Sequence, residues 1–178
     1  MKLRRSGRLV DMTAYLLQHP HQLVPLPFFS DRYRAAKSSI SEDLAIVKEQ
    51  FERQGIGTLV TVAGAAGGVK YISQMKMADA RLLERELKAK LAVTERILPG
   101  GYLYMTDILG DPSYVNQIGR VFASVFSEKE VDVVMTVATK GIPLAYAVAL
   151  HLHVPVVVVR RDSRVTEGSA VSINYVSG

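Results

Sequence analysis

Three adjacent residues, Thr139, Lys140 and Gly141, form a small polar turn between an apolar run and a helical pattern. A second apolar run further along the chain ends in Arg160 and Arg161. Lys and Arg side chains bind phosphate oxygens, and the backbone N–H groups at the start of a helix attract anions. This combination predicts an anion site, and we expect a phosphate group as its occupant.

The elements around this turn have the pattern of a βαβ unit. The apolar runs 131–137 and 154–159 are rich in β-branched residues, and the helical pattern 142–153 lies between them. Parallel strands of this kind are expected to be buried on both faces. Ligands bind just beyond the carboxyl ends of such strands. We expect Gly141 to let the backbone turn tightly and Pro143 to occupy the first turn of the helix.

An ordinary strand-to-helix turn explains the same residues. Most such turns need a glycine, and a Lys or Arg at the end of a strand is often only solvated. The sequence contains neither the G-x-G-x-x-G nor the G-x-x-x-x-G-K-[ST] fingerprint of nucleotide-binding loops. Both interpretations stay open on spacing alone.

The composition indicates a soluble globular chain, because 48% of the residues are hydrophobic and 22% are charged. There is no Cys, which excludes disulfides and Cys-based metal sites. The four His residues show no ligand spacing, so we predict no metal site. No apolar run reaches transmembrane length and the start of the chain lacks a signal-peptide core, so we expect a cytoplasmic protein without membrane contact.

The net charge of +5 is unevenly distributed. Residues 1–74 contain 10 Lys and Arg against 6 Asp and Glu, whereas residues 75–178 contain 12 against 11. A basic excess confined to one part of a chain points to a polyanion as its partner. We therefore predict two domains, 1–74 and 75–178, with the polyanion bound by the first.

The first part has the element order of a winged helix-turn-helix, an α+β domain. Three helical patterns precede two short β patterns around a glycine-rich loop, and in this fold the third helix enters the major groove. Ser39 and Glu42 match a capping box at the start of that helix. Cations and hydroxyls near it suit phosphate oxygens and base edges. The predicted DNA-binding residues are Arg4, Arg5, Arg8, Lys37, Ser38, Ser39, Ser41 and Lys70.

A small helical domain that contacts other proteins is the alternative for this part, with its serines acting only as caps. Residues 75–93 form an amphipathic helix, for which we expect packing in the core over a contact across a dimer. Tyr102 either stacks on a base or sugar of a ligand or packs in a core, and Asp107 either lies near the ligand or caps a helix. Asp111 with Pro112 is expected to start the helix that leads to the βαβ unit.

Several motifs of the second part resemble the adenine- and xanthine-type type I phosphoribosyltransferases over about residues 98–164. They are LPG at 98–100, DIL at 107–109, DP at 111–112 and the run VDVV…ATKGIPLAYAVA…VPVVVVRR. Joined to the basic lead MKLRRSGRLVDMTAYLL, the whole chain resembles the purine operon repressor family of Gram-positive bacteria. The resemblance implies a partial phosphoribosyltransferase-like α/β domain behind the winged helix, and so an α/β fold overall.

The resemblance also implies a function. It implies a dimeric, nucleoid-associated repressor of purine biosynthesis genes that binds double-stranded operator DNA and is not an enzyme. The inducer would be phosphoribosyl pyrophosphate, with or without Mg²⁺, and purine or guanine nucleotides would compete with it; no cofactor is required. The resemblance assigns Thr139, Lys140 and Gly141 to a pyrophosphate-binding loop, and the predicted effector-binding residues are Tyr102, Ala138, Thr139, Lys140, Gly141, Arg160 and Arg161.

The sequence departs from those enzymes in two respects. Lys140 stands where they usually carry Arg, which replaces a planar fork with a point charge. The acidic motif that precedes their ribose-phosphate loop is missing, and the chain reaches Gly178 inside what would be the flexible loop before it. We therefore expect a C-terminally incomplete chain, whose polar stretch 164–168 either closes over the ligand or forms a tail. An active purine phosphoribosyltransferase with an accessory domain, and an adaptor for protein contacts, are the rival functions.

Overall fold

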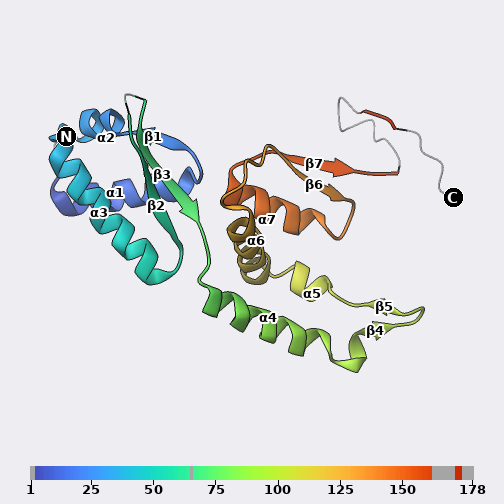
Figure 1. The fold of residues 1–178 in the computed structure, drawn as a ribbon. Helices are drawn as coiled ribbons and strands as arrows, with labels where there is room; N and C mark the ends of the chain where they lie inside the picture. Colours follow the sequence, from blue (N-terminus) through green and yellow to red (C-terminus); the bar gives the residue numbers. More distant parts are fainter. Residues whose placement is uncertain (1–2, 65, 162–170, 174–178) are drawn as a thin grey trace.

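The computed structural model describes residues 3–64, 66–161 and 171–173 (Figure 1). In its first part, three helices precede a β-hairpin, and a further short strand lies between the first two helices. The elements are α1 (Arg5–Gln18), β1 (Leu23–Pro25), α2 (Leu26–Tyr33), α3 (Lys37–Gln54), β2 (Gly57–Val62) and β3 (Gly68–Ser73). This is the predicted winged helix-turn-helix order.

One hydrophobic core holds the three helices against the hairpin. The apolar stripe of α3 lies fully inside it: Ile40, Leu44, Val47 and Phe51 are buried. Phe29 and Tyr33 of α2 pack there too, against Met12 and Leu16 of α1. Every one of these residues lies at helical spacing within its own element, so burial follows directly from the amphipathic pattern.

Hydrogen bonds to the Asp11 carboxylate hold α2 against α1. The carboxylate of Asp11 accepts hydrogen bonds from Arg32 Nε at 2.7 Å and from the Tyr33 hydroxyl at 2.7 Å. The bond from Arg32 is the main reason that the pKa of Asp11 lies below its ordinary value, and Tyr33 adds to it. These hydrogen bonds therefore order the two helices that support α3.

The sheet of this part is antiparallel, in the order β1-β3-β2. Strand β1 was not predicted, because a three-residue strand that ends in Pro25 has no periodicity in the sequence. The capping box was wrong: α3 begins at Lys37, two residues before Ser39, and no side chain caps it. Gly55 ends the helix in the left-handed conformation, with φ 69°.

The second part begins with a long exposed helix. Its elements are α4 (Met77–Leu91), the 3-10 helix η1 (Thr94–Arg96), β4 (Ile97–Leu98), β5 (Tyr102–Leu103), α5 (Thr106–Leu109), α6 (Pro112–Phe126), β6 (Val134–Val137), α7 (Ile142–Leu152) and β7 (Val156–Val159). Figure 1 shows α4 and the β4–β5 hairpin extending away from the packed helices α6 and α7. Only Leu83 of α4 is buried, so the expectation of ordinary core packing for this helix was wrong.

Strands β6 and β7 are parallel and joined by α7, so the predicted βαβ unit is confirmed. Val134 pairs with Val156 and Val137 with Val159. The expectation of burial on both faces was wrong: Met135 and Val137 are 66% and 68% exposed. Their partners in β7, Val157 and Val159, are exposed as well, at 44% and 42%. The alternate strand residues are half-buried: Val134, Thr136, Val156 and Val158. The mixed helix-and-sheet architecture agrees with the predicted α/β class, while the domain boundary between residues 74 and 75 stays a prediction. Within the described ranges, no helix is long and apolar enough to cross a membrane.

Candidate functional sites

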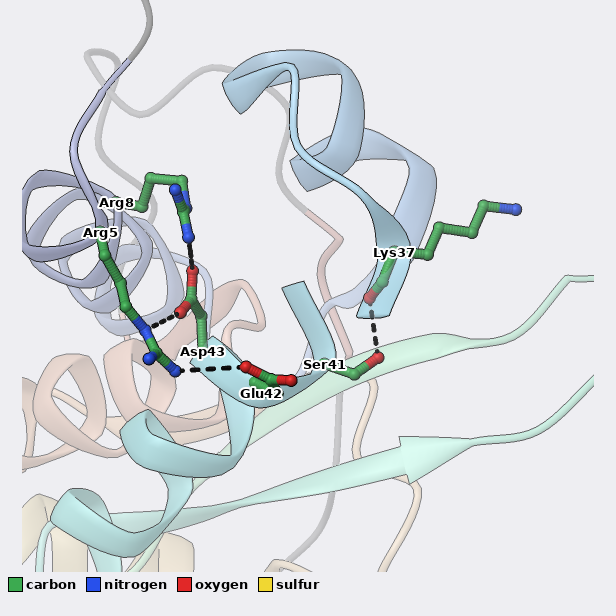
Figure 2. Close-up of polar contacts among 6 residues, drawn as sticks. All are labelled: Arg5, Arg8, Lys37, Ser41, Glu42 and Asp43. Carbon is green, nitrogen blue, oxygen red and sulfur yellow. Dashed lines mark hydrogen bonds and ion pairs between the residues drawn. The ribbon is translucent and has the colours of Figure 1, made fainter. Parts of the chain in front are cut away.

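The first turn of α3 presents polar side chains to solvent. Lys37, Ser38 and Ser41 are exposed and Ser39 is half-buried. The Ser41 hydroxyl donates to the backbone carbonyl of Lys37 at 3.0 Å, and the Lys37 ammonium extends away from the protein (Figure 2). A lysine and two hydroxyls on the exposed end of one helix can reach phosphate and base edges together.

Arg5 and Arg8 bind a carboxylate of α3 instead of projecting alone (Figure 2). Arg5 Nε donates to Asp43 Oδ1 at 2.9 Å, and Arg8 Nε donates to Asp43 Oδ2 at 2.9 Å. The Asp43 side chain is 0% exposed, that of Arg8 15% and that of Arg5 54%. Arg5 also lies 3.5 Å from Glu42. We call Arg5, Arg8 and Asp43 the helix clasp.

Two of the predicted DNA-binding residues, Arg5 and Arg8, therefore bind a carboxylate of the protein itself. Arg8 is mostly covered, so its charge is directed at Asp43, whereas Arg5 keeps half of its side chain in solvent. Arg4 is exposed at the N-cap of α1. Contact of these three arginines with DNA stays a prediction. The sequence did not reveal the clasp, since Asp43 lies on the apolar face of α3 and its partners are 35 and 38 residues away.

Lys70 lies in the middle strand of the sheet rather than at the tip of the hairpin. It lines a cavity of about 510 Å³ between the first and second parts of the chain. His21, His153 and the acidic stretch 128–132 line the same cavity. Lys70 as a wing contact to the DNA backbone stays a prediction, but the structure does not bring it to the hairpin tip.

The predicted effector loop lies at the carboxyl ends of both parallel strands. Ala138 N donates to Val159 O at 2.9 Å, which places the residue after β6 beside the end of β7. Arg160 and Arg161 follow directly, so the strand register brings them to the edge of the sheet that carries the loop. The Ala138–Thr139 peptide is cis. Thr139 and Lys140 are exposed. The cations and the start of α7 are thus gathered at one edge.

Gly141 has a different role from the one expected. Its φ of −75° is ordinary for any residue, so a tight turn is not what requires glycine here. A Cβ at this position would lie 2.3 Å from Thr136 Oγ1. Glycine is needed because the loop passes directly over the side chain of Thr136 in strand β6.

The segment before α6 contributes to the loop through Thr106. The Lys140 ammonium donates to Thr106 Oγ1 at 2.8 Å. The neighbouring Asp107 accepts hydrogen bonds from Arg96, which lower the pKa of this carboxyl to about 2. Tyr102 is 73% exposed, so its core interpretation was wrong, while its stacking on a ligand stays a prediction. The stretch 164–168 lies outside the described residues.

The histidines gather where the two parts of the chain meet, which the sequence did not reveal. His151 Nε2 lies 3.2 Å from the Asn116 carbonyl, which can only accept, so this nitrogen carries the proton. Nδ1 then accepts from the Ser73 hydroxyl at 2.9 Å. Burial is the main cause that lowers the pKa of His151, and Arg120 adds to it. In the part of the chain that the structure describes, no cluster of His, Cys, Asp or Glu could hold a metal ion.

Comparison with known proteins assigns both parts of the chain. Residues 4–73 match the family model described as bacterial purine repressor, N-terminal, and residues 105–178 match the phosphoribosyl transferase domain model. The chain joins a purine-repressor domain to a phosphoribosyltransferase domain. Its resemblance to the purine operon repressors is thereby confirmed. The helix clasp lies in the purine-repressor domain, and the 138–141 loop lies in the phosphoribosyltransferase domain.

Three relatives match over nearly the whole chain. The purine biosynthesis transcriptional repressor PurR of Bacillus subtilis is 70% identical, over 100% of this chain and 62% of that protein. A probable purine biosynthesis transcriptional regulator PurR of Streptococcus pneumoniae is 51% identical, over 100% of this chain and 65% of that protein. The purine biosynthesis transcriptional activator PurR of Lactococcus lactis is 50% identical, over 99% of this chain and 65% of that protein. The chain therefore spans slightly less than two thirds of the length of these relatives.

Proposed function

We propose that this chain is a repressor of purine biosynthesis genes that binds operator DNA through the first turn of α3. The supporting observation is the exposed set Lys37, Ser38 and Ser41 at the start of the third helix, within the residues that match the purine-repressor family model. In a winged helix-turn-helix, this end of the third helix enters the major groove. The names of the Bacillus subtilis and Streptococcus pneumoniae relatives supply the regulatory class.

The second half of the proposal is that phosphoribosyl pyrophosphate acts as inducer at the 138–141 loop, without catalysis. Lys140, Arg160 and Arg161 gather at the sheet edge that parallel α/β folds use for ligands. The start of the 11-residue helix α7 adds the positive end of a helix dipole. Mg²⁺ accompanies the pyrophosphate where it binds, and purine or guanine nucleotides compete for the same site. The repressor acts as a cytoplasmic homodimer.

The ligand can act as inducer only by binding the DNA-free arrangement more tightly than the DNA-bound one. The decisive experiment is a titration of the full-length protein with purine-gene promoter DNA at several salt concentrations, with and without phosphoribosyl pyrophosphate. Salt-dependent binding that the ligand weakens supports the proposal. No binding at low salt would refute the DNA-binding half, and ligand-independent binding would refute the inducer half.

The sign of regulation needs its own test, because the Lactococcus lactis relative is named an activator. Transcription of a purine promoter in vitro, with purified polymerase and increasing protein, separates the two signs. Repression requires transcript levels to fall as the operator fills, and a rise would assign activation instead. The same preparations, incubated with phosphoribosyl pyrophosphate and purine bases, should release no pyrophosphate; turnover would favour an active phosphoribosyltransferase.

A further inference from the structure

Helix α7 reaches from the 138–141 loop to the purine-repressor domain. Its first turn directly follows Gly141, and its last turn carries His151, which bonds to Ser73 at the end of β3. An α-helix of 11 residues is about 16 Å long. A single rigid element thus touches the proposed ligand loop at one end and the sheet that packs against α3 at the other.

The contact between the two parts of the chain is a set of hydrogen bonds, which we call the junction. Ser73 bonds to His151, Gln74 Nε2 donates to Ser127 Oγ at 3.2 Å, and Met75 N donates to Ser124 Oγ at 2.8 Å. A fourth bond, of 2.8 Å, joins Gln22 Nε2 to His153 Nε2 beside the cavity. All four join the purine-repressor domain or the residues just after it to α6 and α7 or to the residues that end them.

Helices α6 and α7 are packed too closely to slide past each other. A Cβ on Gly119 of α6 would lie 2.7 Å from Ala147 of α7, and Ala123, Ala145 and Ala149 are buried nearby. His151 itself bridges to Asn116 of α6 through Nε2. A displacement of the loop at the start of α7 must therefore move the helix pair and the junction together.

Building on the proposed function, we propose that His151 is a positioning residue that couples the 138–141 loop to the DNA-reading helix. His151 links three elements: it belongs to α7, and it bonds to Asn116 of α6 and to Ser73 of β3. Strand β3 packs through Val69 and Tyr71 on the core that holds α3. Ligand at the loop shifts α7, the Ser73 bond changes, and the sheet changes the orientation of α3.

The test compares His151→Phe with His151→Gln in the full-length protein. Phe keeps a ring of similar size and makes no hydrogen bonds, while Gln keeps one donor for Asn116 and one acceptor for Ser73. Leu150→Ala is the matched control, because Leu150 is the preceding residue of α7 and is 67% exposed. The readout is the ratio of operator Kd values with and without phosphoribosyl pyrophosphate, and couplings of this kind are about 5- to 150-fold.

We expect the ratio to fall below about 2 in His151→Phe and to stay near the wild-type value in His151→Gln and Leu150→Ala, with operator affinity in the absence of ligand within about threefold throughout. An unchanged ratio in His151→Phe would overturn the coupling role. If that variant does not fold, Ser73→Ala decides in its place, since it removes only the hydroxyl partner. The same reduction supports the proposal, and a wild-type ratio overturns it.

A DNA-free readout separates this proposal from the proposed function. Hydrogen exchange of the amides of residues 73–76, measured with and without phosphoribosyl pyrophosphate, reports on the junction alone. A ligand-dependent change in wild type that His151→Phe abolishes supports the coupling even if promoter binding fails. No ligand-dependent change at these amides, in a protein that binds both ligand and DNA, would overturn the coupling and leave the proposed function intact.

Discussion

The buried Asp43 carboxylate of α3 lies 2.8 Å from Arg8 Nη2 of α1. The pair joins the helix that carries the N-terminal cations to the helix that carries Lys37 and the serines. Because Asp43 is fully buried, its charge is compensated only while Arg8 and Arg5 stay in place. The angle between α1 and α3 therefore depends on an ion pair as well as on apolar packing.

Asp43→Asn should destabilise the purine-repressor domain by about 3 kcal/mol, because removing one partner of a buried ion pair leaves the other charge unpaired. Denaturant unfolding of the full chain measures this free energy. Glu42→Gln is the matched control, because Glu42 is the neighbouring carboxylate and also pairs with Arg5. That ion pair is exposed and should contribute less than about 1 kcal/mol. Equal losses in the two variants would contradict the structural role of the clasp.

Lys37→Ala should weaken binding to operator and to unrelated DNA alike, and reduce the slope of log K against log salt by about one. Lys48→Ala is its control on the same helix, because Lys48 lies 3.9 Å from Glu52 and three turns from the reading end. Fluorescence anisotropy at several salt concentrations measures both slopes. A larger effect from Lys48 would place the DNA on another face of α3.

The paired change Ser39→Ala and Ser41→Ala should weaken operator binding more than binding to unrelated DNA, because hydroxyls can read base edges. Competition between the two DNAs gives the specificity ratio directly. Ser41 is exposed and donates to Lys37 O, so its lone pairs stay available to a base donor. Unchanged operator affinity would count against α3 as the reader.

Lys140→Ala should reduce affinity for phosphoribosyl pyrophosphate by about 10- to 100-fold, the magnitude of a lost charged hydrogen bond. DNA binding without ligand should not change, because Lys140 contacts Thr106 in the other half of the chain from α3. Calorimetric titration measures the ligand affinity. Lys88→Ala, which removes an exposed cation paired with Glu84, should leave it unchanged; an equal loss there would indicate a general charge effect.

Gly141→Ala should displace the loop and reduce ligand affinity, since the new Cβ would lie 2.3 Å from Thr136 Oγ1. Adding Thr136→Ala removes that oxygen and should restore most of the lost affinity, because the next contact, Val137 O, is 3.4 Å away. Ligand titration of both single variants and the pair measures the coupling. If the losses of affinity in the two single variants simply add in the double variant, the contact with Thr136 is not the reason that position 141 requires glycine.

The free energy of unfolding should decrease as pH falls below about 6.5. Burial lowers the pKa of His151 and of His21 in the folded protein, with contributions from Arg120 to the first and from Lys70 and His153 to the second. The unfolded chain therefore binds more protons just below pH 6.5, and the free energy of unfolding decreases with acidification in that window. Melting temperatures from about pH 5.5 to 7.5 measure it, and a combined His21→Gln and His151→Gln variant should show a flatter profile.

Local patterns predicted most of the elements, whereas long-range polar contacts escaped prediction. The order of three helices and a hairpin in the first part, and the βαβ order in the second, followed from apolar spacing, which the packed core preserves. Nothing in the sequence indicated that Asp43 differs from the other charged residues of the helix, because no local pattern shows that it is buried between two arginines. The His151–Ser73 bond joins residues 78 positions apart, and no spacing rule reaches that far.

The 138–141 loop was likewise predicted in part. Its position at the strand ends followed from the βαβ pattern, but the reason for Gly141 did not, because it depends on the side chain of Thr136 beneath it. Burial of the strands was overestimated, since β-branched residues such as Val137 favour strands whether or not a neighbour covers them.

The chemistry of the junction sets the scale of signal that could operate it. Its bonds join hydroxyls, amides and imidazoles, groups that exchange protein partners for water at a net cost of about 1 kcal/mol each. Unpacking a hydrocarbon interface of similar extent would demand far more. A soluble metabolite, whose preference for one protein state rarely exceeds a few kcal/mol, has enough free energy to rearrange such a joint. The polarity of this boundary is therefore compatible with the proposed coupling to a bound metabolite.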